Sequence, residues 1–164
     1  MKTIRKILPV LLLLLAVLLL LPPAHDTDGT PSAASQTQQT ETVDQNGQKK
    51  LREDGSYTTR EDVTAYLVQY GHLPGNFVTK KEAEKAGWNG GSLDAVLPGK
   101  CIGGDYFGNY ENQLPKAKGR TWYECDINTL GKKGRGAERL VYSSDGLIYY
   151  SGDHYESFNL EYAP

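Results

Sequence analysis

One short segment combines residue types that could act on a phosphate ester. Residues 120–126 read Arg-Thr-Trp-Tyr-Glu-Cys-Asp after a glycine-containing turn, and this mixture of aromatic residues and threonine predicts a β-strand. Because strand side chains alternate between two faces, one face carries Arg120, Trp122, Glu124 and Asp126. A hydrophobic core does not accommodate this set, since an unpaired charge is expensive to bury. A solvated sheet face is the simplest interpretation.

Charged groups further along the chain favour a catalytic site instead. Arg135 and Arg139 follow the segment closely, and Asp153-His154-Tyr155 lies near the end of the chain. A carboxylate and a histidine can serve as base and acid, and guanidinium groups can hold a phosphate. We therefore expect an acid–base site for a phosphate ester in the second half of the chain.

The charge distribution agrees with that location. The chain has 164 residues, 18 Lys and Arg, and 20 Asp and Glu, which allows one domain plus appendages. An acidic excess argues against a general polyanion-binding surface. Between residues 116 and 139, however, seven basic residues face only three acidic ones, so the positive charge is concentrated at the candidate site.

The N-terminal third predicts segments outside the folded domain. Residues 1–24 have a basic start and an apolar run too short for a comfortable membrane span, which predicts a cleaved signal peptide and a secreted protein. A retained membrane anchor stays possible. Residues 25–56 are rich in Thr, Gln and Ser and are predicted to be a disordered pro-segment or linker. The folded domain is expected at residues 57–164.

Within that domain the pattern changes from helices to strands. Thr59 can cap a helix that ends at Gly71, and Thr79 with Glu82 forms a capping-box pattern at the start of a second helix. A third short helix is expected at 93–97. Strands are expected at 101–106, 120–127, 139–143, 147–150 and 155–160. This order predicts an α+β domain with its N-terminal helices packed on one face of a C-terminal antiparallel sheet of about five strands. The other face is expected to be open to water and substrate.

Collinear motifs extend through most of this domain. They include Leu73-Pro74, Gly87-Trp88, Pro98-Gly99-Lys100, Ile102-Gly103-Gly104-Asp105, Leu114-Pro115, Gly119-Arg120-Thr121-Trp122, Asp126-Ile127-Asn128, Tyr142-Ser143-Ser144-Asp145 and Asp153-His154-Tyr155. In these segments the chain resembles the barnase-type family of secreted bacterial ribonucleases, which is related to the guanyl-preferring fungal enzymes.

The resemblance implies a reaction and its catalytic residues. Glu124 would take the proton of the ribose 2′-OH, and His154 would protonate the departing 5′-oxygen. The product would be a 2′,3′-cyclic phosphate, hydrolysed afterwards with the two roles reversed. Lys80, Arg135 and Arg139 would stabilise the charge on the phosphate oxygens. No metal ion or other cofactor is implied. The expected substrate is single-stranded RNA, the protein is expected to be a monomer, and a barstar-like inhibitor is a possible partner.

The resemblance also implies a base-binding loop. Phe107-Gly108-Asn109-Tyr110-Glu111 corresponds to the guanine-binding loop, and Tyr155 is expected to join it in binding substrate. A carboxylate at Glu111 can accept hydrogen bonds from both N–H donors on guanine's edge, while Tyr110 can lie over the ring. Tyr110 stands where barnase has an arginine, and Gly146 replaces a sheet tryptophan. These departures concern affinity and base preference more than the reaction.

Supporting roles are expected for further residues. Asp126 is expected to position Arg135 and Arg139, Asp105 to lie near Lys80, and Arg120 to act as a strut. Cys101 and Cys125, the only two cysteines, fall on consecutive strands that are expected to pair, which predicts a disulfide in an exported chain. The alternative is a pair of buried free thiols on the helix-facing side.

Two other classes of function are compatible with the same fold. A non-catalytic RNA-binding module would keep the arginines and the base loop without requiring both Glu124 and His154. A membrane-tethered interaction domain would keep residues 1–24 as an anchor and use the sheet face for a protein partner.

Overall fold

The computed structural model describes residues 42–43 and 49–164. Strands β1 (Thr42–Val43) and β2 (Lys49–Lys50) form a short antiparallel pair. The predicted signal peptide and most of the predicted linker lie outside the described residues. In the described ranges, no helix has the length and apolar character needed to cross a membrane.

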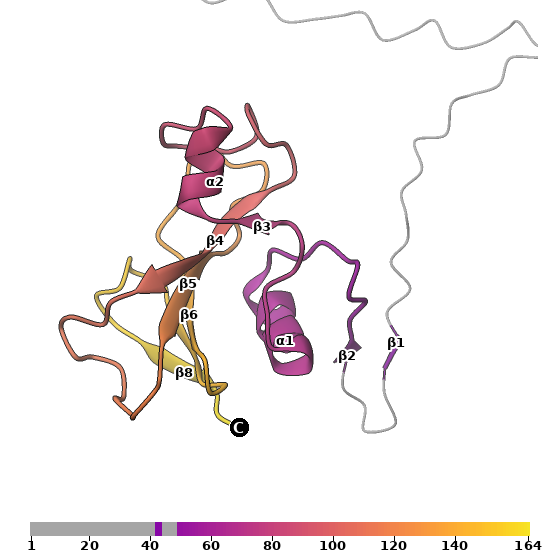
Figure 1. Ribbon diagram of the computed structural model, residues 1–164. Coiled ribbons are helices and arrows are strands. Elements are labelled where there is room, and N and C mark those ends of the chain that lie inside the picture. Colours follow the sequence, from indigo (N-terminus) through magenta and orange to yellow (C-terminus); the bar gives the residue numbers. More distant parts are fainter. Residues whose placement is uncertain (1–41, 44–48) are drawn as a thin grey trace, which may run out of the picture. The chain divides into compact units, whose positions relative to one another are not determined.

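The domain is built on a mixed six-stranded sheet with the strand order β3-β4-β5-β6-β7-β8 (Figure 1). The strands are β3 (Phe77–Val78), β4 (Cys101–Phe107), β5 (Trp122–Asp126), β6 (Arg139–Ser143), β7 (Ile148–Ser151) and β8 (Asn159–Tyr162). β3 runs parallel to β4, and every other pair is antiparallel. The sheet therefore has six strands instead of about five, because the two-residue strand β3 joins its edge.

Two helices precede most of the sheet, and their caps follow the predicted pattern. α1 (Arg60–Tyr70) begins after Thr59, whose side chain accepts from the backbone of Asp62, and ends at Gly71 in the left-handed conformation. α2 (Lys80–Lys85) begins with the complete capping box of Thr79 and Glu82. The third predicted helix is wrong: the described residues 93–97 form one turn, in which the amides of Val96 and Leu97 both donate to Leu93.

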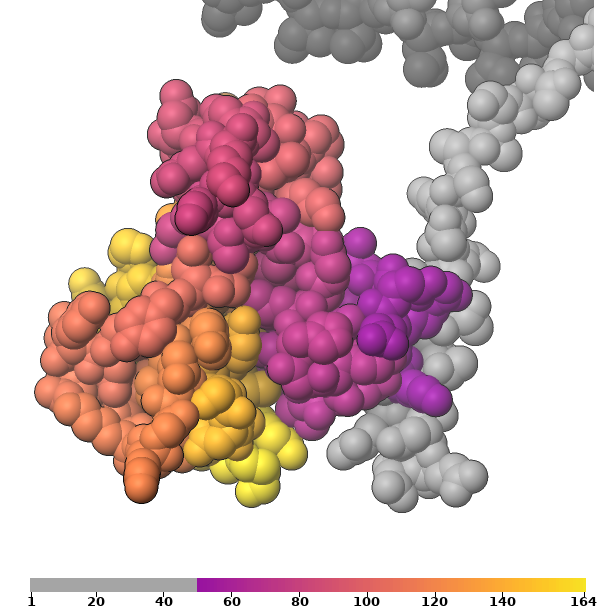
Figure 2. Space-filling model, viewed as in Figure 1, coloured from indigo at the N-terminus to yellow at the C-terminus, as the bar shows by residue number. Residues whose placement is uncertain are grey.

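The main core lies between α1 and one face of the sheet. Val63, Tyr66 and Leu67 of α1 pack with Cys125 and Leu140 from the central strands. Leu51 belongs to the same cluster with only 3% exposure, so the packed domain extends upstream of Tyr57. Its backbone N–H and C=O are held by the side chain of Gln69, and Figure 2 shows this purple segment against the flank of α1.

The opposite sheet face is largely covered as well. Trp122 and Val141 belong to a separate buried cluster with Leu114, and Phe107 and Phe158 pack against it. The expectation of an open second face is therefore wrong, because the β4–β5 loop and the C-terminal segment fold over it. Only 5% of Glu124 remains exposed on this face.

The predicted disulfide is wrong as well, since both cysteines are free and buried. In the pairing of β4 with β5, Cys125 lies opposite Gly103. Cys101 is therefore two residues along β4 from the position that faces Cys125. The sulfur of Cys101 instead accepts a hydrogen bond from the hydroxyl of Thr129 at 3.4 Å. Burial raises the pKa of both thiols.

We expect the unreduced protein to contain two titratable thiols in denaturant and almost none in the native state. Burial disfavours the thiolate, which is the reactive form, and both residues are 1% exposed. Thiol titration with and without guanidinium chloride tests this. Zero thiols in denaturant would show that Cys101 and Cys125 are bridged after all.

Arg120 is a strut between two loops. Its guanidinium holds Asp145 with Nε to Oδ1 at 2.8 Å and Nη2 to Oδ2 at 2.7 Å, and Nη1 donates to the carbonyl of Pro115. The hydrogen bond from Arg120, with a second from Ser143, lowers the pKa of Asp145 from 3.8 to about 2. The carboxylate therefore stabilises the fold above its unfolded pKa, and this contribution is lost as the pH falls through about 2.

Asp145→Asn should accordingly reduce the acid sensitivity of the domain. The unfolding free energy of the wild type is expected to fall more steeply between about pH 4 and pH 2 than that of the variant. Urea titrations across this range measure it, with the exposed Asp94→Asn as matched control. Parallel curves for the wild type and Asp145→Asn would contradict the assignment.

Candidate active site

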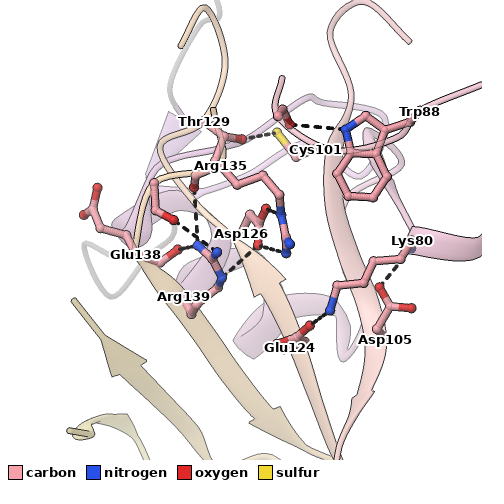
Figure 3. Close-up of polar contacts among 12 residues, drawn as sticks. Lys80, Trp88, Cys101, Asp105, Glu124, Asp126, Thr129, Arg135, Glu138 and Arg139 are labelled. Atoms are coloured by element: carbon pink, nitrogen blue, oxygen red, sulfur yellow. Dashed lines mark hydrogen bonds and ion pairs between the residues drawn. The ribbon is translucent and has the colours of Figure 1, made fainter. Parts of the chain in front are cut away.

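Glu124 occupies the middle of β5, opposite Asp105 on β4 and Val141 on β6. Each of its carboxylate oxygens has a partner: the ammonium of Lys80 forms an ion pair with Oε1, and the hydroxyl of Tyr155 donates to Oε2. These two contacts fix the orientation of the carboxylate. Figure 3 shows Lys80 and Glu124 pointing toward each other across the strands.

Lys80 reaches Glu124 from the first residue of α2. Its backbone N–H donates to Oδ2 of Asp105 at 2.9 Å, which joins the start of the helix to β4. Asp105 thus lies near Lys80, and their contact is made through the Lys80 backbone. The lysine side chain remains 37% exposed beside an almost buried carboxylate, so its ammonium is accessible to a ligand.

Asp126 holds the two arginines that follow it. Arg135 donates from Nε and Nη2 to the two oxygens of Asp126 at 2.5 and 2.8 Å, and Nε of Arg139 lies 2.9 Å from Oδ1 (Figure 3). Burial alone would lower the pKa of Arg135, but the hydrogen bond and charge of Asp126 outweigh it and raise that pKa. The geometry thus agrees with the expected positioning contacts of Asp126.

Arg139 is more enclosed than Arg135. It is 1% exposed, and it donates to the backbone carbonyls of Arg135, Gly136 and Glu138. Its Nε–H does not point at a hydrogen-bond acceptor even though Asp126 lies nearby. Desolvation lowers the pKa of Arg139. Its buried guanidinium therefore holds the 135–139 loop in place through three backbone carbonyls.

His154 lies on an exposed loop next to Tyr155, with the two ring centroids 5.0 Å apart. Its backbone N–H donates to the carbonyl of Ala137 at 3.1 Å, and this hydrogen bond connects the loop of His154 to the 135–139 loop. His154 and Tyr155 have φ angles of 60° and 75°. Two consecutive non-glycine residues in the left-handed region are strained and persist only where the surroundings hold them.

The loop around His154 is held by Asp153 together with two serines, Ser151 and Ser157, that the sequence pattern did not single out. Asp153 accepts from the hydroxyls of Ser151 and Ser157 at 2.8 and 2.5 Å, and Tyr155 N–H donates to Ser151. The Ser157 hydroxyl is the main cause that lowers the pKa of Asp153 to about 2. Two serines flanking an aspartate at this spacing are a recognisable turn signal.

A groove joins His154 to the predicted base-binding loop. It has a volume of about 440 Å³ and is lined by Phe107, Asn109, Glu111, His154 and Tyr155, among others. The side chain of Asn109 does not face a ligand: it makes two hydrogen bonds with the backbone of Leu114, at 2.9 and 3.0 Å, and so closes the loop. Glu111 is exposed at this groove.

Tyr110 lies elsewhere. It does not line the groove of Glu111 and His154 but a second groove on the other side of the loop. Its ring covers Gly108 so closely that a Cβ at Gly108 would lie 2.2 Å from it. The glycine is therefore required for this arrangement, and the ring is not placed over the expected base position.

The predicted catalytic groups thus converge from four parts of the chain: the start of α2, the centre of β5, the 135–139 loop and the 153–155 loop. In the described ranges, no cluster of three or more His, Cys, Asp and Glu residues could hold a metal ion. An enclosed carboxylate, an exposed histidine and accessible cations beside a groove make up a candidate acid–base site for phosphodiester chemistry.

Comparison with known sequences assigns the class. The chain belongs to the barnase-type family of microbial ribonucleases, since the sequence model of the ribonuclease family matches residues 25–161.

Individual relatives agree with this assignment. A ribonuclease of Heyndrickxia coagulans is 52% identical over 102 residues, which cover 61% of this chain and 93% of that protein. A ribonuclease of Bacillus intermedius has the same identity over 102 residues, and the match spans 62% of its length. The guanyl-specific ribonuclease St of Saccharopolyspora erythraea is 39% identical over 57 residues, 35% of this chain and 56% of that protein.

Proposed function

We propose that this protein is a secreted endoribonuclease that cleaves single-stranded RNA after guanosine. The observation that carries the proposal is the convergence of Glu124, Lys80 and Tyr155 beside a groove that also contains His154 and Glu111. Membership of the ribonuclease family supports RNA as substrate, and the guanyl-specific relative supports the base preference.

The reaction follows from the protein's own acid and base. Glu124 accepts the proton of the 2′-OH, the 2′-oxygen attacks phosphorus, and the bond from phosphorus to the 5′-oxygen breaks. His154 donates its proton to that leaving oxygen. The product is a 2′,3′-cyclic phosphate, which a water molecule opens with His154 as base and Glu124 as acid. Since the substrate supplies the nucleophile, no covalent enzyme intermediate is needed.

The cations have different tasks in this proposal. Lys80 and Arg135 are partly exposed and can contact the phosphate oxygens directly as negative charge develops. Arg139 is buried against Asp126 and three carbonyls, so it acts through its charge and by holding the loop. DNA should bind without being cut, because it lacks the 2′-OH.

Guanine would be read in the groove beside His154. Its N1–H and N2–H donors face the carboxylate of Glu111, and the rings of Phe107, Tyr155 and His154 provide aromatic walls. Adenine presents an acceptor at N1, which would leave the Glu111 carboxylate facing a lone pair. A site built for a donor rejects an analogue that lacks it.

Glu111→Ala should therefore erode the preference for guanosine. The ratio of kcat/KM for GpU to kcat/KM for ApU is expected to fall by roughly ten- to a hundredfold, which corresponds to the free energy of a hydrogen bond to a charged group. Glu156→Ala, which removes another carboxylate from the same groove, is the matched control and should leave the ratio unchanged. Equal rates on GpU and ApU with the wild type would reject guanine reading.

Incubating purified protein with RNA in EDTA tests the reaction itself. We expect metal-independent cleavage that yields 2′,3′-cyclic phosphate ends, detectable by mass spectrometry. Binding without cleavage would instead favour the non-catalytic RNA-binding module. Intact mass of the material released by the producing cell tests secretion, since residues 1–24 should be missing from it.

A further inference from the structure

A second groove lies on the other side of the base-binding loop. It has a volume of about 490 Å³ and is lined by the end of β4, by Tyr110 and Lys116, and by the beginning of β5. Phe107 and Asn109 line both grooves, so the two are separated only by the loop. Figure 2 shows the β4–β5 segment, in salmon to orange, at the outer edge of the folded domain.

The most exposed aromatic rings of the described residues gather at this second groove. Tyr110 is 83% exposed and Tyr106 is 64% exposed, more than any other large hydrophobic side chain in residues 50–164, and both line the groove. Large apolar groups gathered at one exposed place indicate a binding surface. A tyrosine ring is a stacking platform for any nucleobase.

The charge of the second groove suits a polyanion. Neither Asp nor Glu lines it, while Lys116 and Arg120 do. The charge of Arg120 is neutralised by Asp145, whereas none of the ion pairs among the described residues involves Lys116. Lys116 is exposed and therefore free to contact a phosphate.

The position along β5 indicates which side of the substrate this groove would hold. Asp126, Glu124 and Trp122 succeed one another along the strand face. The arginines lie at the Asp126 end, and the proposed reaction therefore puts the scissile phosphate and the leaving 3′ nucleotide at that end. The second groove lies at the Trp122 end. An RNA strand that extends from the arginines past the guanosine toward Trp122 therefore reaches the second groove with the nucleotide on the 5′ side of the guanosine.

From these observations we propose that the second groove binds the nucleotide immediately 5′ to the cleaved guanosine. The base stacks on Tyr106 and Tyr110, and the phosphate between this nucleotide and the guanosine lies near Lys116. The site accepts any base, because stacking and a phosphate contact carry no sequence information. The inference rests on the proposed function, whose guanosine site defines the position of the 5′ nucleotide.

The experiment compares GpU with ApGpU, which differ only by a 5′ nucleotide. The wild type is expected to cleave ApGpU with a kcat/KM roughly five- to a hundredfold higher than that for GpU, the range of one stacked base. Tyr106→Ala should remove most of this advantage without changing the rate on GpU, and Tyr106→Phe should retain it. Lys116→Ala should reduce it, whereas Lys118→Ala, an exposed lysine outside the groove lining, should not.

A binding measurement separates failure of this inference from failure of the proposed function. The uncleavable analogues of ApGpU and GpU, in which deoxyguanosine replaces guanosine, are titrated against the wild type and Tyr106→Ala. Tighter binding of the longer analogue, lost in Tyr106→Ala, supports the second groove even if no substrate is cleaved. Equal kcat/KM and equal affinity for the two lengths overturn it, as does an advantage that survives both Tyr106→Ala and Lys116→Ala.

Discussion

Glu124→Ala and His154→Ala are each expected to reduce the cleavage of GpU by two or more orders of magnitude. A positioned general acid or base contributes about 10²- to 10⁴-fold to such reactions. Glu124 is held by Lys80 and Tyr155 on a central strand. Glu124→Ala therefore removes both the proposed base and the ion-pair partner of Lys80. His154 is exposed on its loop, so its replacement should affect the rate far more than the stability.

The pH dependence of the rate provides an independent signature. The first step needs one group deprotonated and the other protonated, so the profile of kcat/KM should be bell-shaped in the wild type. Glu124→Ala should lose the acidic limb and His154→Ala the alkaline limb. Glu84→Gln and His72→Ala, exposed residues elsewhere in the domain, are the matched controls. A near-normal rate in either alanine variant would refute the acid–base pair.

Asp126→Asn is expected to lower the unfolding free energy by about 3–5 kcal/mol, the usual effect of removing one partner from a buried ion pair. Asp126 is 1% exposed and is the carboxylate that faces both Arg135 and Arg139. Asparagine keeps the shape but leaves two partly or fully buried cations without a counter-charge. Activity should fall as well, because Arg135 loses its bidentate anchor.

Urea unfolding of the wild type and Asp126→Asn measures the effect. Asp145→Asn, which breaks an exposed pair, is the matched control and should change the stability far less. If Asp126→Asn does not fold, Arg135→Gln separates the contributions, since it leaves the Arg139 pair in place. A loss below about 1 kcal/mol in Asp126→Asn would show that the two cations do not depend on this carboxylate.

Local chemistry explains which parts of the fold could be predicted from the sequence. Thr59, Thr79 and Glu82 act on backbone groups within a few residues, so both caps could be read directly. β3 could not, because a two-residue strand exists only through its parallel pairing with the distant β4. The disulfide failed for a similar reason: the register of β4 against β5, with its irregularity after Gly103, decides which residue lies opposite Cys125.

In the candidate site, too, some features could be predicted from the sequence and others depend on packing in the folded chain. The pairing of Asp126 with Arg135 could be anticipated, because the arginine follows it closely in the chain and few other carboxylates lie nearby in the sequence. The direction of Tyr110 could not, since it depends on how its ring packs over Gly108. The enclosure of Arg139 by three carbonyls likewise depends on the path of the loop between Arg135 and Glu138.

The left-handed backbone at His154 and Tyr155 has a consequence for engineering and for natural variation. Each such residue costs about 1–2 kcal/mol relative to glycine, and Ser151, Asp153 and Ser157 hold the loop against that cost. A library of variants of this domain that is selected only for thermal stability should therefore enrich glycine at position 154. The selected variants would be more stable but inactive. Screens for durable variants of this protein need an activity step beside the thermal one.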